Sequence, residues 1–215
     1  MGYTAILFDM DGTLMNTLED MAASVNATLR ALGYGERSRE QVRAFVGNGA
    51  EMLIRRAMPE GSGEQEIAQA LERYREHYAA HCREKTRPYD GIVALLETLH
   101  DEGKRVAVVS NKPEGALWTL CDEYFAGLVE VVVGDTPGRR RKPWPDMVEA
   151  ALKALGAEKK DAVYVGDSEV DVQTGKNAGL PVIAVSWGFR GREALEKAGA
   201  ERIADTVEQL YRELT

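Results

Sequence analysis

Four aspartates in this sequence stand just after short apolar runs that are typical of buried strands. Asp9 and Asp11 follow the first such run, and Asp167 and Asp171 follow a later one. In open α/β sheets, residues beyond the carboxyl ends of the strands gather at one edge, where ligands bind. Carboxylates that meet there repel one another strongly at a low effective dielectric, so they require a cation. Oxygen ligands without histidine or cysteine favour Mg²⁺.

Further polar residues suit a phosphate site at the same edge. Ser110 and Asn111 follow another apolar run, and Lys142 precedes a predicted helix. A Mg²⁺ ion and the ammonium group of Lys142 together offset three of the four negative charges. The pattern therefore predicts a site that accepts a phosphate group.

The elements that must position these residues are apolar runs rich in β-branched side chains, with helical patterns between them. The runs are residues 5–8, 106–109, 129–133, 162–165 and 182–185. Helices are expected at 92–102, from Pro113, from Pro145 and at 170–178. Uninterrupted hydrophobicity is typical of strands buried on both faces. We therefore predict a doubly wound α/β fold with a mainly parallel, Rossmann-like sheet of five or more strands.

The connection after the first strand is abnormally long. Residues 17–87 contain no strand-like run but several helical patterns. One helix face carries apolar residues at spacings of 4, 3 and 4, namely Ile67, Leu71, Tyr74 and Tyr78. An all-helical insert of this length far exceeds a usual βα connection. We expect an α/β core formed by residues 1–15 and 88–215, with an inserted helical cap domain formed by residues 16–87.

These motifs resemble those of the haloacid dehalogenase superfamily of phosphotransferases. The run Asp9-Met10-Asp11-Gly12-Thr13-Leu14 is similar to its first motif, DxDGT. Ser110 matches the second motif, Lys142 the third, and residues 166–171 the fourth, in the family's order. The helical insert lies where that family places a small cap, so the resemblance covers the whole chain. Four ordered motifs are much more specific than a lone DxDGT.

The resemblance implies a role for the aspartates. Asp9 would attack phosphorus and form an aspartyl phosphate. Asp11 would protonate the leaving oxygen and later activate water. Mg²⁺ would be held by the Asp9 carboxylate, the Asp11 backbone carbonyl and Asp167, with Asp171 reached directly or through water.

The resemblance also implies contacts to the phosphoryl group. Lys142 would pair with this group and with Asp9, and Ser110 and Asn111 would hydrogen-bond it. Thr13 belongs to the first motif and is expected at the substrate too.

Within the superfamily, the sequence is most similar to phosphoglycolate phosphatases, through residues 110–113, 134–137 and 45–50. The turn that contains Gly47 and Asn48 would reach from the cap over the phosphate and set substrate preference. Candidate donors to a substrate carboxylate are Arg43, Asn48 and Arg55. We therefore expect Mg²⁺-dependent hydrolysis of 2-phosphoglycolate to glycolate and phosphate.

Several alternatives stay open at this point. The same chemistry could act on pyrophosphate, a sugar phosphate or a nucleoside monophosphate, or could serve a β-phosphoglucomutase-like phosphomutase. A phospho-accepting module similar to response-regulator receivers also uses an aspartate, Mg²⁺, a hydroxyl and a lysine. Receivers, however, carry the phosphorylated aspartate on a later strand and lack a long helical insert.

Composition narrows the range of partners. The 215 residues include 27 Lys and Arg against 35 Asp and Glu, and the net charge of −8 argues against nucleic acid or anionic membranes as partners. No apolar run approaches the about 18 residues of a membrane span. Cys82 and Cys121 form no CxxC pair and suit a reducing cytosol. We expect a cytoplasmic monomer or small homo-oligomer that acts on a small phosphorylated metabolite.

A histidine pair offers a weaker signal elsewhere in the chain. His77 and His81 have the i, i+4 spacing that can hold zinc on a helix, but the sequence nearby supplies no third ligand. An exposed face of a cap helix is the better interpretation of this pair.

Overall fold

The computed structural model describes residues 2–215, and in that range the chain forms a six-stranded sheet in the order β5-β4-β1-β6-β7-β8. The strands are β1 (Ala5–Phe8), β4 (Arg105–Pro113), β5 (Val131–Asp135), β6 (Ala162–Gly166), β7 (Val182–Val185) and β8 (Ile203–Ala204). Neighbouring strands all pair in parallel. The predicted parallel α/β fold is confirmed. The sequence did not reveal β8, because two residues are too few to form a recognisable apolar run.

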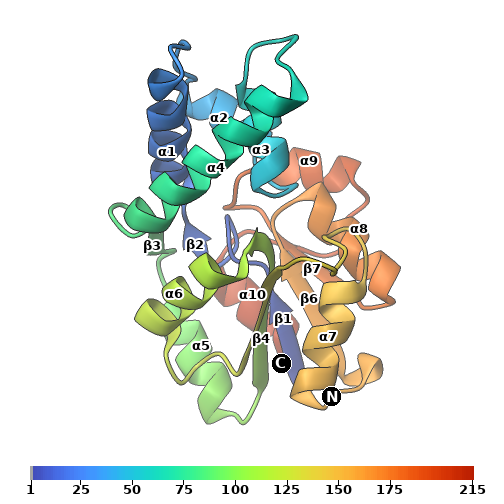
Figure 1. Cartoon of the computed structure of the whole chain (residues 1–215). Coiled ribbons are helices and arrows are strands. Elements are labelled where there is room, and N and C mark those ends of the chain that lie inside the picture. The colour runs from blue at the N-terminus through green and yellow to red at the C-terminus, as the bar shows by residue number, and fades with distance from the viewer. Residues whose placement is uncertain (1) are drawn as a thin grey trace.

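Two helical layers enclose this sheet (Figure 1). Helices α5 (Ile92–Asp101), α6 (Glu114–Phe125) and α10 (Val207–Leu214) cover one face. Helices α7 (Asp146–Leu155) and α8 (Glu169–Ala178) cover the other, and α9 (Arg192–Lys197) packs against α8. Strand β1 shows why both faces must be apolar. Its Ile6 and Phe8 join one apolar cluster and its Leu7 joins the other, as expected because side chains alternate along a strand.

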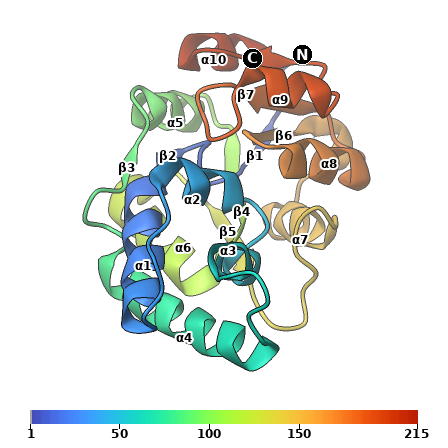
Figure 2. The ribbon, with the colours of Figure 1, turned by 90° about the horizontal axis from the view of Figure 1, so that it is seen from above.

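Four further helices form a bundle with an apolar cluster of its own. They are α1 (Leu18–Ala31), α2 (Arg39–Phe45), α3 (Ala50–Ala57) and α4 (Glu64–His81). Leu29, Ile54 and Tyr74 are buried in this cluster, and Phe189 from the loop after β7 packs there too. Viewed from above, α3 lies over β4 (Figure 2). The bundle therefore covers the end of the sheet where the sequence places the functional residues.

The chain passes between the sheet and the bundle twice, at adjacent points. Strands β2 (Met15–Asn16) and β3 (Arg87–Pro88) pair antiparallel there. Buried Asp20 of α1 accepts hydrogen bonds from the backbone N–H groups of Lys85, at 3.0 Å, and Thr86, at 2.9 Å. These contacts tie the second connection to the first helix of the bundle. Among the described helices, none combines the length and hydrophobicity of a membrane-crossing helix.

Candidate active site

Three aspartate carboxylates meet at the carboxyl ends of β1 and β6, which are neighbours in the sheet. Asp9 directly follows β1, Asp167 follows β6, and Asp171 lies in the first turn of α8. All three are buried, and each offers an oxygen within 4.8 Å of the others. This convergence is the spatial arrangement that the sequence pattern requires.

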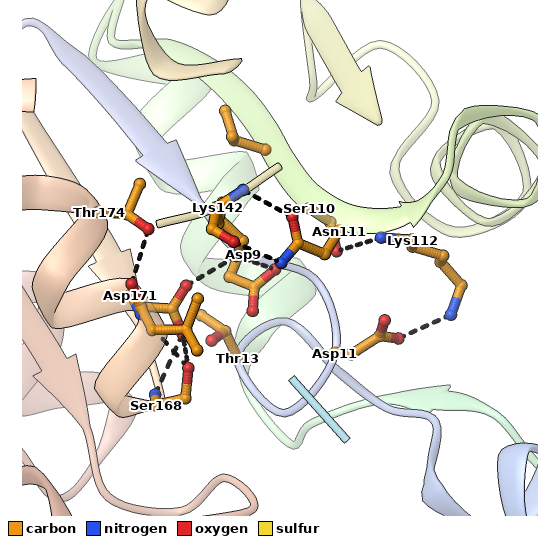
Figure 3. A network of polar contacts seen from close by, with 12 residues as sticks. Asp9, Asp11, Thr13, Ser110, Asn111, Lys112, Lys142, Ser168, Asp171 and Thr174 are labelled. Atoms are coloured by element: carbon orange, nitrogen blue, oxygen red, sulfur yellow. Dashed lines mark hydrogen bonds and ion pairs between the residues drawn. The ribbon is translucent and has the colours of Figure 1, made fainter. Parts of the chain in front are cut away.

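The side chain of Asp11 lies outside this group of three. Its Oδ1 atom is 2.8 Å from the Nζ atom of Lys112 (Figure 3). The resemblance to known phosphotransferases assigns only the backbone carbonyl of Asp11 to the metal. The carboxylate of Asp11 is thus engaged by a lysine of β4 and is not part of the cluster formed by Asp9, Asp167 and Asp171.

Two glycines make room for Asp167. Gly12 has φ +90°, and a Cβ atom there would lie 2.4 Å from Asp167 Oδ2. A Cβ atom on Gly188 would lie 2.3 Å from the same oxygen. That oxygen accepts a 2.6 Å hydrogen bond from the backbone N–H of Phe189, and Thr13 Oγ1 donates to Asp167 Oδ1 at 3.3 Å. Any side chain at either glycine would displace the carboxylate.

Lys142 is buried between two carboxylates. Its Nζ atom lies 2.9 Å from Asp9 Oδ1, 2.7 Å from Asp171 Oδ1 and 3.1 Å from the hydroxyl of Tyr164. The amide of Asn111 holds its backbone, because Oδ1 accepts from Lys142 N–H at 2.8 Å and Nδ2 donates to Lys142 C=O at 3.2 Å. The lysine is thus fixed from both ends.

Asp171 has both carboxylate oxygens occupied. Lys142 and the hydroxyl of Tyr164 contact Oδ1, and the Ser168 hydroxyl and N–H donate to Oδ2 at 2.6 and 3.1 Å. Ser168 caps α8, so the same contacts begin the helix and fix the carboxylate. Asp171 therefore positions the ammonium group of Lys142, and neither of its oxygens lacks a protein donor.

Burial dominates the electrostatics of this site. It raises the pKa of Asp9 to about 7; the charge of Asp171 adds to this effect and Lys142 opposes it. Burial likewise raises the pKa of Asp167 well above its usual range. For Lys142, burial lowers the pKa, but attraction by Asp171 and Asp9 outweighs it and keeps the pKa above its ordinary value. The lysine stays charged, and the carboxylates carry excess negative charge whenever they ionise.

The oxygens of Asp9 and Asp167 fit a divalent cation. Asp9 Oδ1 is buried and, although the ammonium group of Lys142 is close, no donor points at it in hydrogen-bonding geometry. Buried carboxylates in excess over neighbouring cations are stabilised by a bound metal ion, and an all-oxygen set suits Mg²⁺-type ions.

A small cavity that is partly open to solvent separates this site from the helical bundle, with about 50 Å³ of space for the centres of water-sized molecules. Only a small molecule fits a cavity of this size. Its cap side is largely apolar and includes Met21, Val46, Leu53, Tyr74 and Tyr78.

The cavity includes some of the substrate-binding residues expected from the sequence and excludes others. Ser110, Asn111 and Gly47 line it, and Asn111 Nδ2 also donates to the Gly47 carbonyl at 3.1 Å. Thr13 and Asn48 are not among the residues that line this cavity, and their contact with the substrate stays a prediction. The Thr13 hydroxyl is committed to Asp167, and Asn48 Oδ1 accepts from Arg56 at 2.9 Å.

The two arginines suggested for a substrate carboxylate are also outside the cavity lining. Arg43 Nε donates to the backbone carbonyl of Phe189 at 2.5 Å. Arg55 pairs on the surface with Glu64 at 2.5 Å. Long side chains can reach many partners, and the sequence alone does not select among them.

Two cavity residues had no role in the sequence analysis. Lys112 Nζ, on a side chain that is 2% exposed, contacts Asp11 and donates to the Tyr78 hydroxyl at 2.6 Å. Burial raises the pKa of Tyr78 well above its usual value, so its hydroxyl stays protonated. Lys112 lies two residues after Ser110, and this position in the sequence could have indicated that it lies near the site. Tyr78 matches the apolar face of its helix and therefore resembles a core residue.

Comparison with known proteins identifies the family. Residues 6–185 match the haloacid dehalogenase-like hydrolases. The chain belongs to this family. Phosphoglycolate phosphatase 1 of Pseudomonas aeruginosa is 36% identical over 201 residues, which are 90% of this chain and 73% of that protein. A phosphoglycolate phosphatase of Rhodospirillum rubrum is 36% identical over 215 residues, covering 96% of this chain and 88% of the relative.

A solved structure extends the likeness to three dimensions. A crystal structure from Lactobacillus delbrueckii subsp. bulgaricus, proposed to be a phosphoglycolate phosphatase, has a TM-score of 0.94 and 36% identity, and covers 100% of this chain and 99% of that one. This haloacid dehalogenase-like hydrolase is a phosphoric monoester hydrolase.

Proposed function

We propose that the chain is a Mg²⁺-dependent phosphatase that hydrolyses a small phosphomonoester, with 2-phosphoglycolate as its preferred substrate. The observation that carries the proposal is the buried meeting of Asp9, Asp167 and Lys142 at the floor of a small cavity. The relatives at 36% identity that are named phosphoglycolate phosphatases support the choice of substrate.

The reaction proceeds in two displacements at Asp9. A carboxylate oxygen of Asp9 bonds to phosphorus as the bond from phosphorus to the alcohol oxygen breaks, and Asp11 gives its proton to that oxygen. Water then attacks phosphorus and gives a proton to Asp11. Phosphate leaves, and both aspartates return to their starting states.

The remaining polar residues bind and orient. Lys142 holds Asp9 and pairs with the phosphoryl group, and Ser110 donates a hydrogen bond to a phosphoryl oxygen. Asn111 acts mainly by positioning Lys142, because its side-chain amide hydrogen-bonds the backbone N–H and C=O of that lysine.

Asp9, Asp167 and the backbone carbonyl of Asp11 would hold Mg²⁺. When bound, the ion neutralises charge and helps align the phosphoryl group for attack. Asp171, whose two oxygens already have protein donors, would support the ion mainly by orienting Lys142.

Residues 16–87 serve as a cap over a core made of residues 1–15 and 88–215. The paired connections β2 and β3 would allow the bundle to open for substrate entry and to close for catalysis. Closure excludes water from the phosphoester and brings the turn at Gly47 over the site.

The chain suits a reducing compartment such as the cytoplasm. Cys82 and Cys121 are both buried free thiols. Thiols of this kind pack as small apolar groups and need no oxidising environment.

A substrate panel tests this function. Phosphate release is measured from 2-phosphoglycolate, pyrophosphate, a hexose 1-phosphate and a nucleoside monophosphate, with Asp9→Asn as the control for contaminating phosphatase. We expect the highest kcat/KM for 2-phosphoglycolate. A higher value for another member would reassign the substrate. Conversion of hexose 1-phosphate to an isomer would instead indicate a phosphomutase, and a long-lived phosphoprotein would indicate a receiver-like module.

A further inference from the structure

Lys112 is a cationic side chain of the cavity with hydrogen-bonding capacity left over. Lys142, by comparison, contacts Asp9, Asp171 and Tyr164, all of them groups of the core. Arg190, which also lines the cavity, pairs through Nε with Glu169 at 3.0 Å and donates to backbone carbonyls of the bundle. Lys112 has two partners, Asp11 and Tyr78. Its third N–H is unused among the residues that the structure describes.

Tyr78 supplies a second donor at the same place. Its hydroxyl oxygen accepts from Lys112, and within residues 2–215 no acceptor is found for its own proton. Lys112 comes from β4 and Tyr78 from α4, and both line the cavity. One donor from a strand of the sheet and one from a helix of the bundle thus lie 2.6 Å apart in the cavity.

The wall of the cavity beside Tyr78 is apolar. It includes Met21 and Leu53 of the bundle and Phe189 of the loop after β7, which share one apolar cluster with Tyr78. An anionic group buried there without a partner would be strongly unfavourable. Lys112 is the cation in contact with Tyr78 on this side, so a substrate carboxylate that enters here would pair with it.

We propose that Lys112 and the Tyr78 hydroxyl together bind the carboxylate of a small phosphorylated hydroxy acid and set the specificity of this site. The proposal rests on the proposed phosphomonoesterase function and adds the residues that select its substrate. An ammonium group that bridges two carboxylates already occurs in this molecule, because Lys142 contacts both Asp9 and Asp171. Lys112 would likewise keep its contact with an oxygen of Asp11 and use its remaining N–H for the substrate carboxylate.

The location of the pair links recognition to the position of the bundle. The carboxylate subsite is complete only when α4 lies against β4. A substrate with a carboxylate therefore stabilises the closed arrangement, and one without it does not.

The experiment compares two substrates that differ only at the carboxylate. 2-Phosphoglycolate is matched by 2-hydroxyethyl phosphate, in which a hydroxymethyl group replaces the carboxylate. The readout is the ratio of their kcat/KM values in the parent, Lys112→Met, Lys112→Arg and Tyr78→Phe. A ratio is needed because Lys112 also holds Asp11, so its loss can slow both substrates.

We expect the parent to favour 2-phosphoglycolate, and Lys112→Met to lower the ratio by about 10- to 100-fold, the range for a lost charge-assisted hydrogen bond. Tyr78→Phe should lower it by about 10-fold, the low end of the range for one hydrogen bond to a charged carboxylate. Lys112→Arg retains the charge and should keep most of the preference. Lys153→Met makes the same change on an exposed lysine of α7 and should leave the ratio unchanged.

An unchanged ratio in both Lys112→Met and Tyr78→Phe would overturn the proposal while leaving the phosphatase function intact. So would a parent that hydrolyses 2-hydroxyethyl phosphate as well as 2-phosphoglycolate. A parent that releases phosphate from no member of the substrate panel would instead refute the proposed function itself.

A second measurement needs no variant and covers the case in which Lys112→Met fails to fold. Glycolate should competitively inhibit hydrolysis of p-nitrophenyl phosphate by the parent, and ethylene glycol at the same concentration should not. Equal effects of the two compounds would overturn the proposal.

Discussion

The two sides of the cavity differ in how they are built. On the core side, Asp9 directly follows β1, and Lys142 is held by an ion pair with Asp9 and by a buried hydrogen bond to Asn111 of β4. On the cap side, apolar side chains such as Leu53 belong to a bundle that joins the core through two paired connections. A rigid floor suits phosphoryl transfer, which needs fixed charges, and a hinged wall suits substrate selection.

The same contrast appears in the partners of the two cavity lysines. Lys142 contacts groups of the core, whereas Lys112 shares its ammonium group between the core and the bundle. Changes on the core side should therefore abolish chemistry, and changes on the cap side should alter preference and affinity.

The largest effect is expected from Asp9→Asn. This change removes the attacking oxygen while preserving size, and we expect phosphate release to fall by at least about 10³-fold for every substrate. Steady-state phosphate assays measure it. Substantial retained activity would show that Asp9 is not the nucleophile.

The same variant should gain stability in the metal-free state. Burial raises the pKa of Asp9 to about 7 from the model-compound value of 3.8, so folding favours the protonated form. The stability that Asp9 contributes is full below its unfolded pKa and is lost as pH rises toward 7. With chelator present, Asp9→Asn should therefore unfold at a higher temperature than the parent at pH 8, with a smaller difference at pH 5. Thermal unfolding at both pH values measures it, and a difference that grows at pH 5 would contradict this sign.

An intermediate effect is expected from Asp20→Ala at the base of the bundle. The change removes buried hydrogen bonds to Lys85 and Thr86. It should lower the free energy of unfolding by about 2 kcal/mol, the value of a hydrogen bond to a charged group. It should also lower kcat/KM by about 10-fold through poorer closure, with Mg²⁺ affinity unchanged. Equal losses in kcat/KM and Mg²⁺ affinity would show that the two sides are not separable.

The smallest effect is expected from Arg55→Ala. Arg55 pairs with Glu64 on the surface of the bundle, outside the cavity lining. We expect kcat/KM for 2-phosphoglycolate to change by less than about 2-fold, as for a surface substitution away from the site. A large loss would mean that Arg55 swings into the cavity and binds the substrate carboxylate.

The core side could be predicted from sequence because it depends on local rules. An uninterrupted apolar run specifies a buried strand, and the residue after it must emerge at the sheet edge. Asp9 after β1 and Asp167 after β6 follow this rule. The expected run at 129–133 instead became Val131–Asp135, because Val129 packs against the core from the preceding loop without joining the sheet.

The cap side could not be predicted in the same way. The position of Tyr78 over Lys112 depends on how α4 is oriented relative to β4, and no local pattern encodes that orientation. A tyrosine on an apolar helix face predicts that the side chain is buried. It does not predict whether the hydroxyl contacts a lysine of another element. The partners of arginines are equally hard to predict from sequence. The guanidinium group of Arg43 donates to the backbone carbonyls of Phe189 and Gly188, which only the tertiary fold brings close to it.

The central claim is that the carboxylates at the ends of β1 and β6 act with a divalent cation. The most direct test is phosphate release from 2-phosphoglycolate by chelator-treated parent, before and after Mg²⁺ is restored. We expect the rate to fall to that of Asp9→Asn under chelation and to recover with Mg²⁺. A chelated enzyme that keeps its full rate would contradict the claim.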